Sequence, residues 1–175
     1  MKYCAFLRGV NIKGTNMKMA EVCRVFEDAG MQKVTSVLAS GNIIFSSEGN
    51  TSELKSILEK AMSIYFNYQA FLFIRTKDEI EECLKNNPYK KDEKLHIYSF
   101  IGDGDIKHIL LKEFEAGSKT ENEKAQITGN TFYWQVPKGN TLDSSFGKIL
   151  GKKSLKDQFT SRNMNTFEKI LKKMS

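Results

Sequence analysis

The sequence predicts an α+β protein built from two tandem β-α-β-β-α-β units, each with an antiparallel sheet and a trailing helix. One observation behind this prediction is a repeated turn. Ser40-Gly41-Asn42 has a counterpart in Thr128-Gly129-Asn130, 88 residues later in a chain of 175 residues. The other is the order of strand-like and helix-like segments, which is the same in both halves, with matching segments roughly 87 to 92 residues apart. Together the two observations indicate a duplicated fold.

Turn and capping residues set the boundaries in the first half. Gly30 ends the first helix, because glycine takes the left-handed conformation at little cost. Gly41-Asn42 is expected to form a two-residue hairpin turn. Asn50 is expected to cap the second helix, and Thr76-Lys77-Asp78-Glu79 is a capping-box sequence. These signals predict strands at about 2–8, 33–39, 42–47 and 70–75, and helices at about 17–29, 51–66 and 77–86.

The second half repeats this order. Gly129-Asn130 separates two strand-like segments, and Asn165 with Glu168 gives the last helix a box-like start. The order is that of the ferredoxin-like unit. With the polar stretch 86–94 as linker, we expect domains at 1–88 and 94–175, the second with a basic C-terminal segment. The predicted strands lie at about 95–101, 124–128, 131–136 and 157–160, and the helices at about 104–115, 144–151 and 165–173.

The composition is typical of a soluble globular protein. The chain begins directly with a strand-like run, lacks a secretory signal pattern, and has no apolar stretch near the ~20 residues that span a bilayer. We therefore expect a cytoplasmic protein without membrane contact. Cys4, Cys23 and Cys83 are far apart and odd in number, and His96 and His108 form no ligand pair. No disulfide, metal or cofactor is expected.

Positive charge is concentrated towards the C-terminus. The formal net charge is +6, and residues 137–175 account for all of it, with nine basic residues against three acidic ones. Such an excess attracts polyanions without specifying one. The alternative is a solvated, lysine-rich surface.

The loop after the first strand has residues that suit an anion. Arg8-Gly9-Val10-Asn11-Ile12-Lys13-Gly14-Thr15 joins a strand to a helix, where backbone N–H groups and the helix dipole favour negative charge. The Walker sequence requires lysine after the second glycine, and Thr15 stands there, which disfavours a nucleotide triphosphatase. A looser anion site would use Arg8, Lys13 and the amides near Asn16. The alternative is a tight loop that needs glycine dihedral angles.

Two further polar segments are candidates for the same site. Ser40 and Asn42 would line a pocket with the first loop, although turn formation alone also explains them. Thr160-Ser161-Arg162-Asn163-Met164-Asn165-Thr166 has more polar side chains than helix capping needs. Arg162 in this segment offers a bidentate fork for a carboxylate or phosphate. This hypothesis places Arg8 and Arg162 close together on the surface.

The sequence lacks recognisable catalytic and RNA-binding motifs. There is no nucleophile elbow, and the acidic residues are scattered. RNA-recognition domains of the split βαβ type stack bases on aromatic residues of a central strand, and the segment 42–47 lacks their signature. Phe132 and Trp134 share one face of a strand and Tyr133 the other, which indicates core packing, with base stacking at the surface as the alternative.

The motifs taken together resemble a known family. Arg8-Gly9-Val10-Asn11, Ser40-Gly41-Asn42 followed by Ile43-Ile44-Phe45, Asn87-Pro88-Tyr89 and the polar segment 160–166 are similar to the bacterial domain-of-unknown-function family 1697. The resemblance covers essentially the whole chain. It implies a cytoplasmic α+β protein with ferredoxin-like halves, and it gives no activity. It also implies that the positions to test are Arg8, Asn11, Ser40, Asn42, Arg162, Asn163 and Asn165.

Three functions stay open on the sequence, of which we favour the first. That function is non-catalytic binding of an anionic ligand or nucleic acid. The second is a structural or assembly module, in which exposed strands or faces pair two copies as a homodimer. The third is an enzyme with an unrecognised site, at which His96 or Cys4 would lie beside a cleft; no catalytic residue is identified for it. The residues expected to bind the ligand are Arg8, Asn11, Lys13, Asn16, Ser40, Asn42, Arg162, Asn163 and Asn165.

Overall fold

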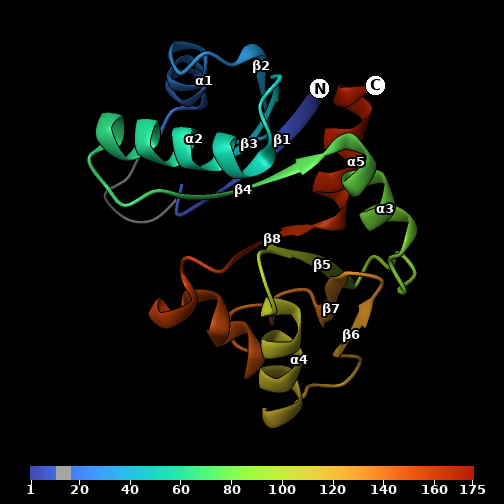
Figure 1. The fold of residues 1–175 in the computed structure, drawn as a ribbon. Helices are drawn as coiled ribbons and strands as arrows, with labels where there is room; N and C mark the ends of the chain where they lie inside the picture. Colours follow the sequence, from blue (N-terminus) through green and yellow to red (C-terminus); the bar gives the residue numbers. More distant parts are fainter. Residues whose placement is uncertain (11–16) are drawn as a thin grey trace. The chain divides into compact units, whose positions relative to one another are not determined.

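The computed structural model describes residues 1–10 and 17–175 (Figure 1). The first half of the chain folds as β1 (Lys2–Arg8), α1 (Met19–Asp28), β2 (Gln32–Val37), β3 (Asn42–Ser46), α2 (Thr51–Phe66), β4 (Phe71–Thr76) and α3 (Lys77–Lys85). The second half folds as β5 (Leu95–Gly102), α4 (Ile106–Ala116), β6 (Lys124–Thr128), β7 (Thr131–Pro137), the 3-10 helices η1 (Phe146–Gly151) and η2 (Lys153–Leu155), β8 (Phe159–Asn163) and α5 (Met164–Met174).

The described residues form two four-stranded antiparallel sheets with equivalent strand orders. One sheet has the order β2-β3-β1-β4 and the other β6-β7-β5-β8. Both are ferredoxin-like orders, so the predicted α+β fold with two tandem ferredoxin-like units is confirmed. In the second half of the chain, the 3-10 helices η1 and η2 stand between β7 and β8, at the position that α2 has between β3 and β4 in the first half. Among the described residues, no helix has the length and apolar character needed to cross a membrane.

Packing divides the chain into two compact units, and these do not follow the order of the chain. The first unit comprises Met1–Glu81 and Thr166–Ser175, and the second comprises Glu82–Asn165. The C-terminal helix packs in the first unit, where the rings of Phe6 and Phe167 lie 5.4 Å apart. The expected boundaries 1–88 and 94–175, which do follow chain order, stay a prediction.

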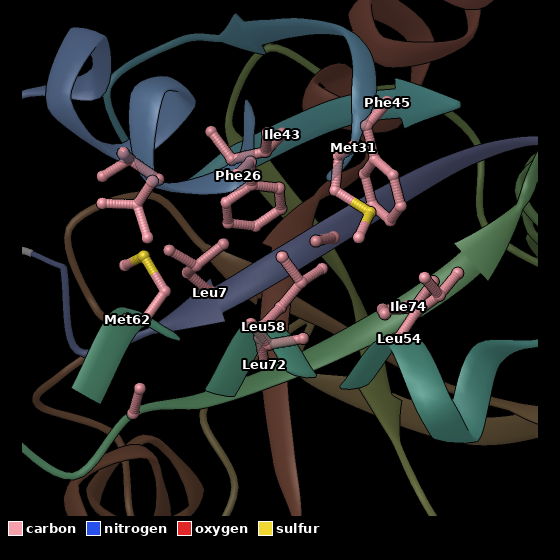
Figure 2. Packing of buried hydrophobic residues seen from close by; sticks show 14 of the residues in the cluster. Leu7, Phe26, Met31, Ile43, Phe45, Leu54, Leu58, Met62, Leu72 and Ile74 are labelled. Atoms are coloured by element: carbon pink, nitrogen blue, oxygen red, sulfur yellow. The ribbon is translucent and has the colours of Figure 1, made fainter. Parts of the chain in front are cut away.

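The core of the first unit lies between its sheet and the helices α1 and α2 (Figure 2). Leu54, Leu58 and Met62 are spaced four residues apart, so they share the face of α2 that is directed at Leu7 and Leu72 of the sheet. Burying each such side chain stabilises the fold by about 1.5–3 kcal/mol. Asn50 fixes the start of this helix as predicted: its Oδ1 accepts the Glu53 N–H at 2.9 Å.

Aromatic rings fill the core of the second unit. Phe132 and Trp134 lie on the core face of β7, and the Trp134 and Phe146 rings are 5.0 Å apart. Tyr133 lies on the opposite face, where its hydroxyl donates to the Cys83 carbonyl at 2.6 Å. The predicted alternation is therefore confirmed. All three strand residues are buried, so their rings present no surface on which a base could stack.

The two copies of the repeated tripeptide form different turns. Gly129 and Asn130 are the two-residue turn predicted for the second hairpin, since Thr128 pairs with Thr131. In the first hairpin Val37 pairs with Asn42, so residues 38–41 form a four-residue turn and Asn42 is the first residue of β3. The prediction of a two-residue turn at Gly41-Asn42 is therefore wrong. Gly41 has φ of +82°, a conformation that glycine takes at little cost.

The polar segment before the last helix is a strand. Residues 159–163 form β8, in which Ser99 of β5 pairs with Arg162, whereas the sequence placed a strand only at 157–160. Asn163 precedes α5, and its Oδ1 accepts the Asn165 N–H at 3.0 Å. Asn163, rather than Asn165 as predicted, therefore provides the first cap of this helix.

Candidate functional site

The end of β1 and the β2–β3 turn pack tightly against each other. The Leu7 N–H donates to the Gly41 carbonyl at 2.8 Å, and a Cβ on Gly41 would lie 2.6 Å from Val10 Cγ2. The Asn42 side chain is fully buried, and its Nδ2 donates to the Val37 carbonyl and to Ser40 Oγ, both at 2.9 Å. The amide of Asn42 thus closes the turn.

The structure describes only some of the residues predicted to form the first-loop site. Arg8 is half-buried at the end of β1, in the same unit as Ser40 and Asn42. Asn11, Lys13 and Asn16 lie outside the described residues. A ligand role for this group stays a prediction.

Arg162 is held by its own strand. Its side chain is 8% exposed, and Nη1 donates to Thr160 Oγ1 and to the Ser161 carbonyl, each at 2.8 Å. The sequence suggested a guanidinium fork directed at a ligand, and the structure shows that one of its nitrogens is engaged locally. Because Arg162 belongs to the second unit and Arg8 to the first, the expectation that they lie close together also stays a prediction.

Asn163 links His96 to the start of α5. The Asn165 N–H binds Asn163 Oδ1, so Asn163 Nδ2 is directed at His96 Nδ1, 3.0 Å away. Nδ1 is then the acceptor and Nε2 carries the proton in the neutral ring. Burial, and after it the charge of Lys138, lowers the pKa of His96 below its ordinary value. The neutral imidazole is therefore the form that this arrangement favours.

A basic pocket lies on the second unit beside α4 and η1. It has a volume of about 270 Å³. The buried side chains of Phe146 and Ile149 supply apolar surface, while Lys148 and Lys152 supply ammonium groups. We call this feature the basic pocket, and its lining residues are Glu113, Ser145, Phe146, Lys148, Ile149 and Lys152.

The two lysines of the basic pocket differ in their partners. Lys152 Nζ lies 3.5 Å from Glu113 Oε1, so its charge is partly balanced. Lys148 is exposed, and no described residue forms a hydrogen bond or ion pair with it. Sequence reasoning noted the lysine-rich segment but did not select these residues. The spacing of four residues between Lys148 and Lys152, at the end of the predicted helix 144–151, was the available signal.

Metal binding and cysteine chemistry were the other possibilities for the described part of the chain. No group of three or more His, Cys, Asp or Glu side chains there is arranged to hold a metal ion. Cys4 and Cys83 are buried, and Cys23 is only half-buried. Burial raises the pKa of the Cys23 thiol, which makes it a weaker nucleophile at neutral pH.

The comparisons with known proteins agree with the motif pattern. Residues 1–133 match the family described as "Protein of unknown function (DUF1697)". The chain belongs to the DUF1697 family. A solved structure, that of the conserved bacterial protein SP0830 from Streptococcus pneumoniae, is similar over 99% of this chain and 97% of that chain, with a TM-score of 0.79 and 21% sequence identity. At this identity the likeness shows the fold alone. No curated protein matches the chain.

The basic pocket of this DUF1697 protein lies mostly outside the matched region. Of its lining residues, Glu113 falls within residues 1–133 and the other five follow them. The family match therefore carries no information about the pocket, and its role rests on geometry and charge.

Proposed function

We propose that this DUF1697 protein is a non-catalytic binder of a small anionic ligand, and that the basic pocket receives the phosphate or carboxylate group of that ligand. The observation that supports this most is Lys148, an exposed ammonium group at a pocket of about 270 Å³ that no described residue neutralises. Lysine binds phosphate as a point charge.

The size of the pocket favours a small ligand over a polymer. Its volume is slightly below the ~300–1,000 Å³ typical of small-molecule sites. The apolar side chains of Phe146 and Ile149 suit the carbon skeleton of a ligand, and the Ser145 hydroxyl offers a hydrogen bond to its anionic group. Glu113 binds Lys152 and repels a second anionic group, so a ligand with one phosphate or carboxylate fits best.

Thermal unfolding in the presence of anions tests this function. We would measure the melting temperature with inorganic phosphate, phosphorylated sugars and oligonucleotides, because a ligand that binds only the native state raises it. Lys148→Ala should reduce the shift, whereas Lys60→Ala, an exposed lysine on α2 of the first unit, should not.

Two outcomes would contradict the proposal. One is that no small anion stabilises the wild type; the other is that Lys148→Ala retains the full shift. If only oligonucleotides stabilise the protein, and this stabilisation falls steeply at rising salt, the basic pocket and its lysines would be assigned to nucleic acid instead.

A further inference from the structure

The edges of the two sheets differ in how their backbone groups are satisfied. The edge strands are β2 and β4 in the first sheet and β6 and β8 in the second. An edge strand presents unpaired N–H and C=O groups that another strand can bind. In the described part of the chain, three of these four edges carry side chains that bind such groups.

The edge of β4 is covered by side chains from α2 and from β4 itself. Lys55 Nζ donates to the Leu72 carbonyl, and Glu59 Oε1 accepts the Leu72 N–H at 3.2 Å. Arg75 Nη1 donates to the Ile74 carbonyl at 2.9 Å. The N–H and C=O of Leu72 and the C=O of Ile74 are therefore occupied. An added strand would find few free backbone groups on this edge.

The edges of β2 and β8 are blocked by single basic residues. Lys173 Nζ of α5 donates to the Ser36 carbonyl at 2.9 Å, and β2 has an irregular register between Gln32 and Thr35. On β8, Arg162 Nη1 occupies the Ser161 carbonyl at 2.8 Å. Charged side chains and irregular register are both means by which edge strands avoid pairing with other chains.

The edge of β6 carries no such side chain. Thr128 and Thr131 flank a two-residue turn and form a hydrogen-bonded pair, so alternation directs the N–H and C=O groups of Ala125 and Ile127 away from β7. Among residues 1–10 and 17–175, no side chain binds the backbone of either residue. The four outward groups of Ala125 and Ile127 are thus available to another strand.

We propose that β6 pairs antiparallel with β6 of a second copy of this chain, joining the two second-unit sheets into one continuous sheet. The outward N–H and C=O groups of Ala125 bind those of the partner's Ile127, and those of Ile127 bind the partner's Ala125. The two-fold axis passes beside Gln126. This is an isologous interface, in which one surface binds its own copy. It is separate from the basic pocket, so ligand binding and pairing are tested independently.

Charge along the strand supports a second copy as the partner. In this register Lys124 lies opposite the partner's Thr128, so no lysine meets another lysine. The exposed Glu121 precedes β6, at the end where the partner's Asn130 follows its own β6. Lys107 Nζ binds Asn130 Oδ1 at 2.6 Å, so an acidic side chain of one copy faces a basic one of the other.

Sedimentation of the full chain over a range of concentrations tests whether it pairs through this edge. The wild type should form a dimer that dissociates on dilution. Ala125→Pro removes an outward N–H and should weaken the dimer at least about tenfold. Ala125→Ser keeps this N–H and should dimerise like the wild type.

Cross-linking tests the register of the β6 pair, and it does not depend on whether the proline variant folds. Gln126 and the partner's Gln126 would form a non-hydrogen-bonded pair with Cα atoms about 4.5 Å apart, which a disulfide can join. Gln126→Cys should give a covalent dimer under mild oxidation. Thr128→Cys, two residues along the same face, should not, because it lies opposite Lys124. A wild type that stays monomeric at every concentration, a dimer that Ala125→Pro leaves intact, or equal cross-linking of the two cysteine variants would overturn the proposal.

Discussion

At the scale of single residues, the two asparagines of the repeated tripeptide have different roles. Asn42 is fully buried and its amide binds Val37 and Ser40, whereas Asn130 is exposed and its Oδ1 accepts a hydrogen bond from Lys107 Nζ. The sequence predicted the glycine and asparagine at a turn in both cases. It did not show which asparagine is buried, because that depends on strand register, and shifting the first residue of β3 changes which side chains face the core.

Removing the Asn42 amide should therefore destabilise the protein much more than removing that of Asn130. Asn42→Ala removes the buried amide that donates to the Val37 carbonyl and to Ser40 Oγ, which should cost about 1–3 kcal/mol. Asn130→Ala, as a matched control at an exposed position, should stay within about 0.5 kcal/mol of the wild type. Urea unfolding measures both changes. Equal effects of the two substitutions would show that Asn42 does not hold the turn.

At the scale of secondary-structure elements, the capping signals of α2 and α3 were reliable, whereas that of α5 was not. The Thr76 and Glu79 box forms as predicted, with the Thr76 N–H bound to Glu79 Oε2 at 2.7 Å and the Glu79 N–H bound to Thr76 Oγ1 at 3.2 Å. The strand β8 was mostly missed because its residues are polar. Its side chains bind neighbouring groups instead of alternating apolar with polar, so the period of two that marks a strand is absent.

The joint between β5, β8 and α5 should make stability depend on pH. The pKa of His96 is lower in the folded protein than its ordinary value of 6.5, so folding favours the neutral ring. The unfolded chain then binds the proton more readily, and stability falls as the pH drops below about 6.5, until the folded ring is protonated too. Protonation also puts an N–H at Nδ1, opposite the Asn163 amide that caps α5.

His96→Asn tests this dependence, since the asparagine oxygen takes the place of Nδ1 and does not titrate. We expect the wild type to lose stability relative to this variant between pH 7 and pH 5, as measured by urea unfolding at each pH. His108 is present in both proteins, so its contribution cancels in the difference. A constant difference across this range would contradict the role given to His96.

At the scale of the whole molecule, the duplication was predictable and the assignment of the last helix was not. Repeated element order predicts two sheets of equal topology, as found. Helical periodicity predicts that α5 has an apolar face, but not which sheet covers that face. The structure places its residues from Thr166 onwards in the first unit, and with them Lys169, Lys172 and Lys173. The C-terminal excess of charge is thus divided, and each unit has a formal charge of +3.

Phe167→Ala should destabilise the first unit, although it lies at the end of the chain. The ring is 1% exposed and packs on Phe6 of β1, so its loss should cost about 3–5 kcal/mol. Hydrogen exchange should speed up first at the amides of β1, with Lys172→Ala, an exposed change on the same helix, as the control. Faster exchange confined to β7 would contradict the assignment of α5 to the first unit.

An NMR titration of the ¹⁵N-labelled protein with inorganic phosphate tests most directly whether the basic pocket binds anions. The account predicts that the largest amide shift changes fall on Ser145–Lys152, saturate with added phosphate, and are lost in Lys148→Ala. Shift changes confined to residues 8–16 and 40–42, or none at millimolar phosphate, would contradict it.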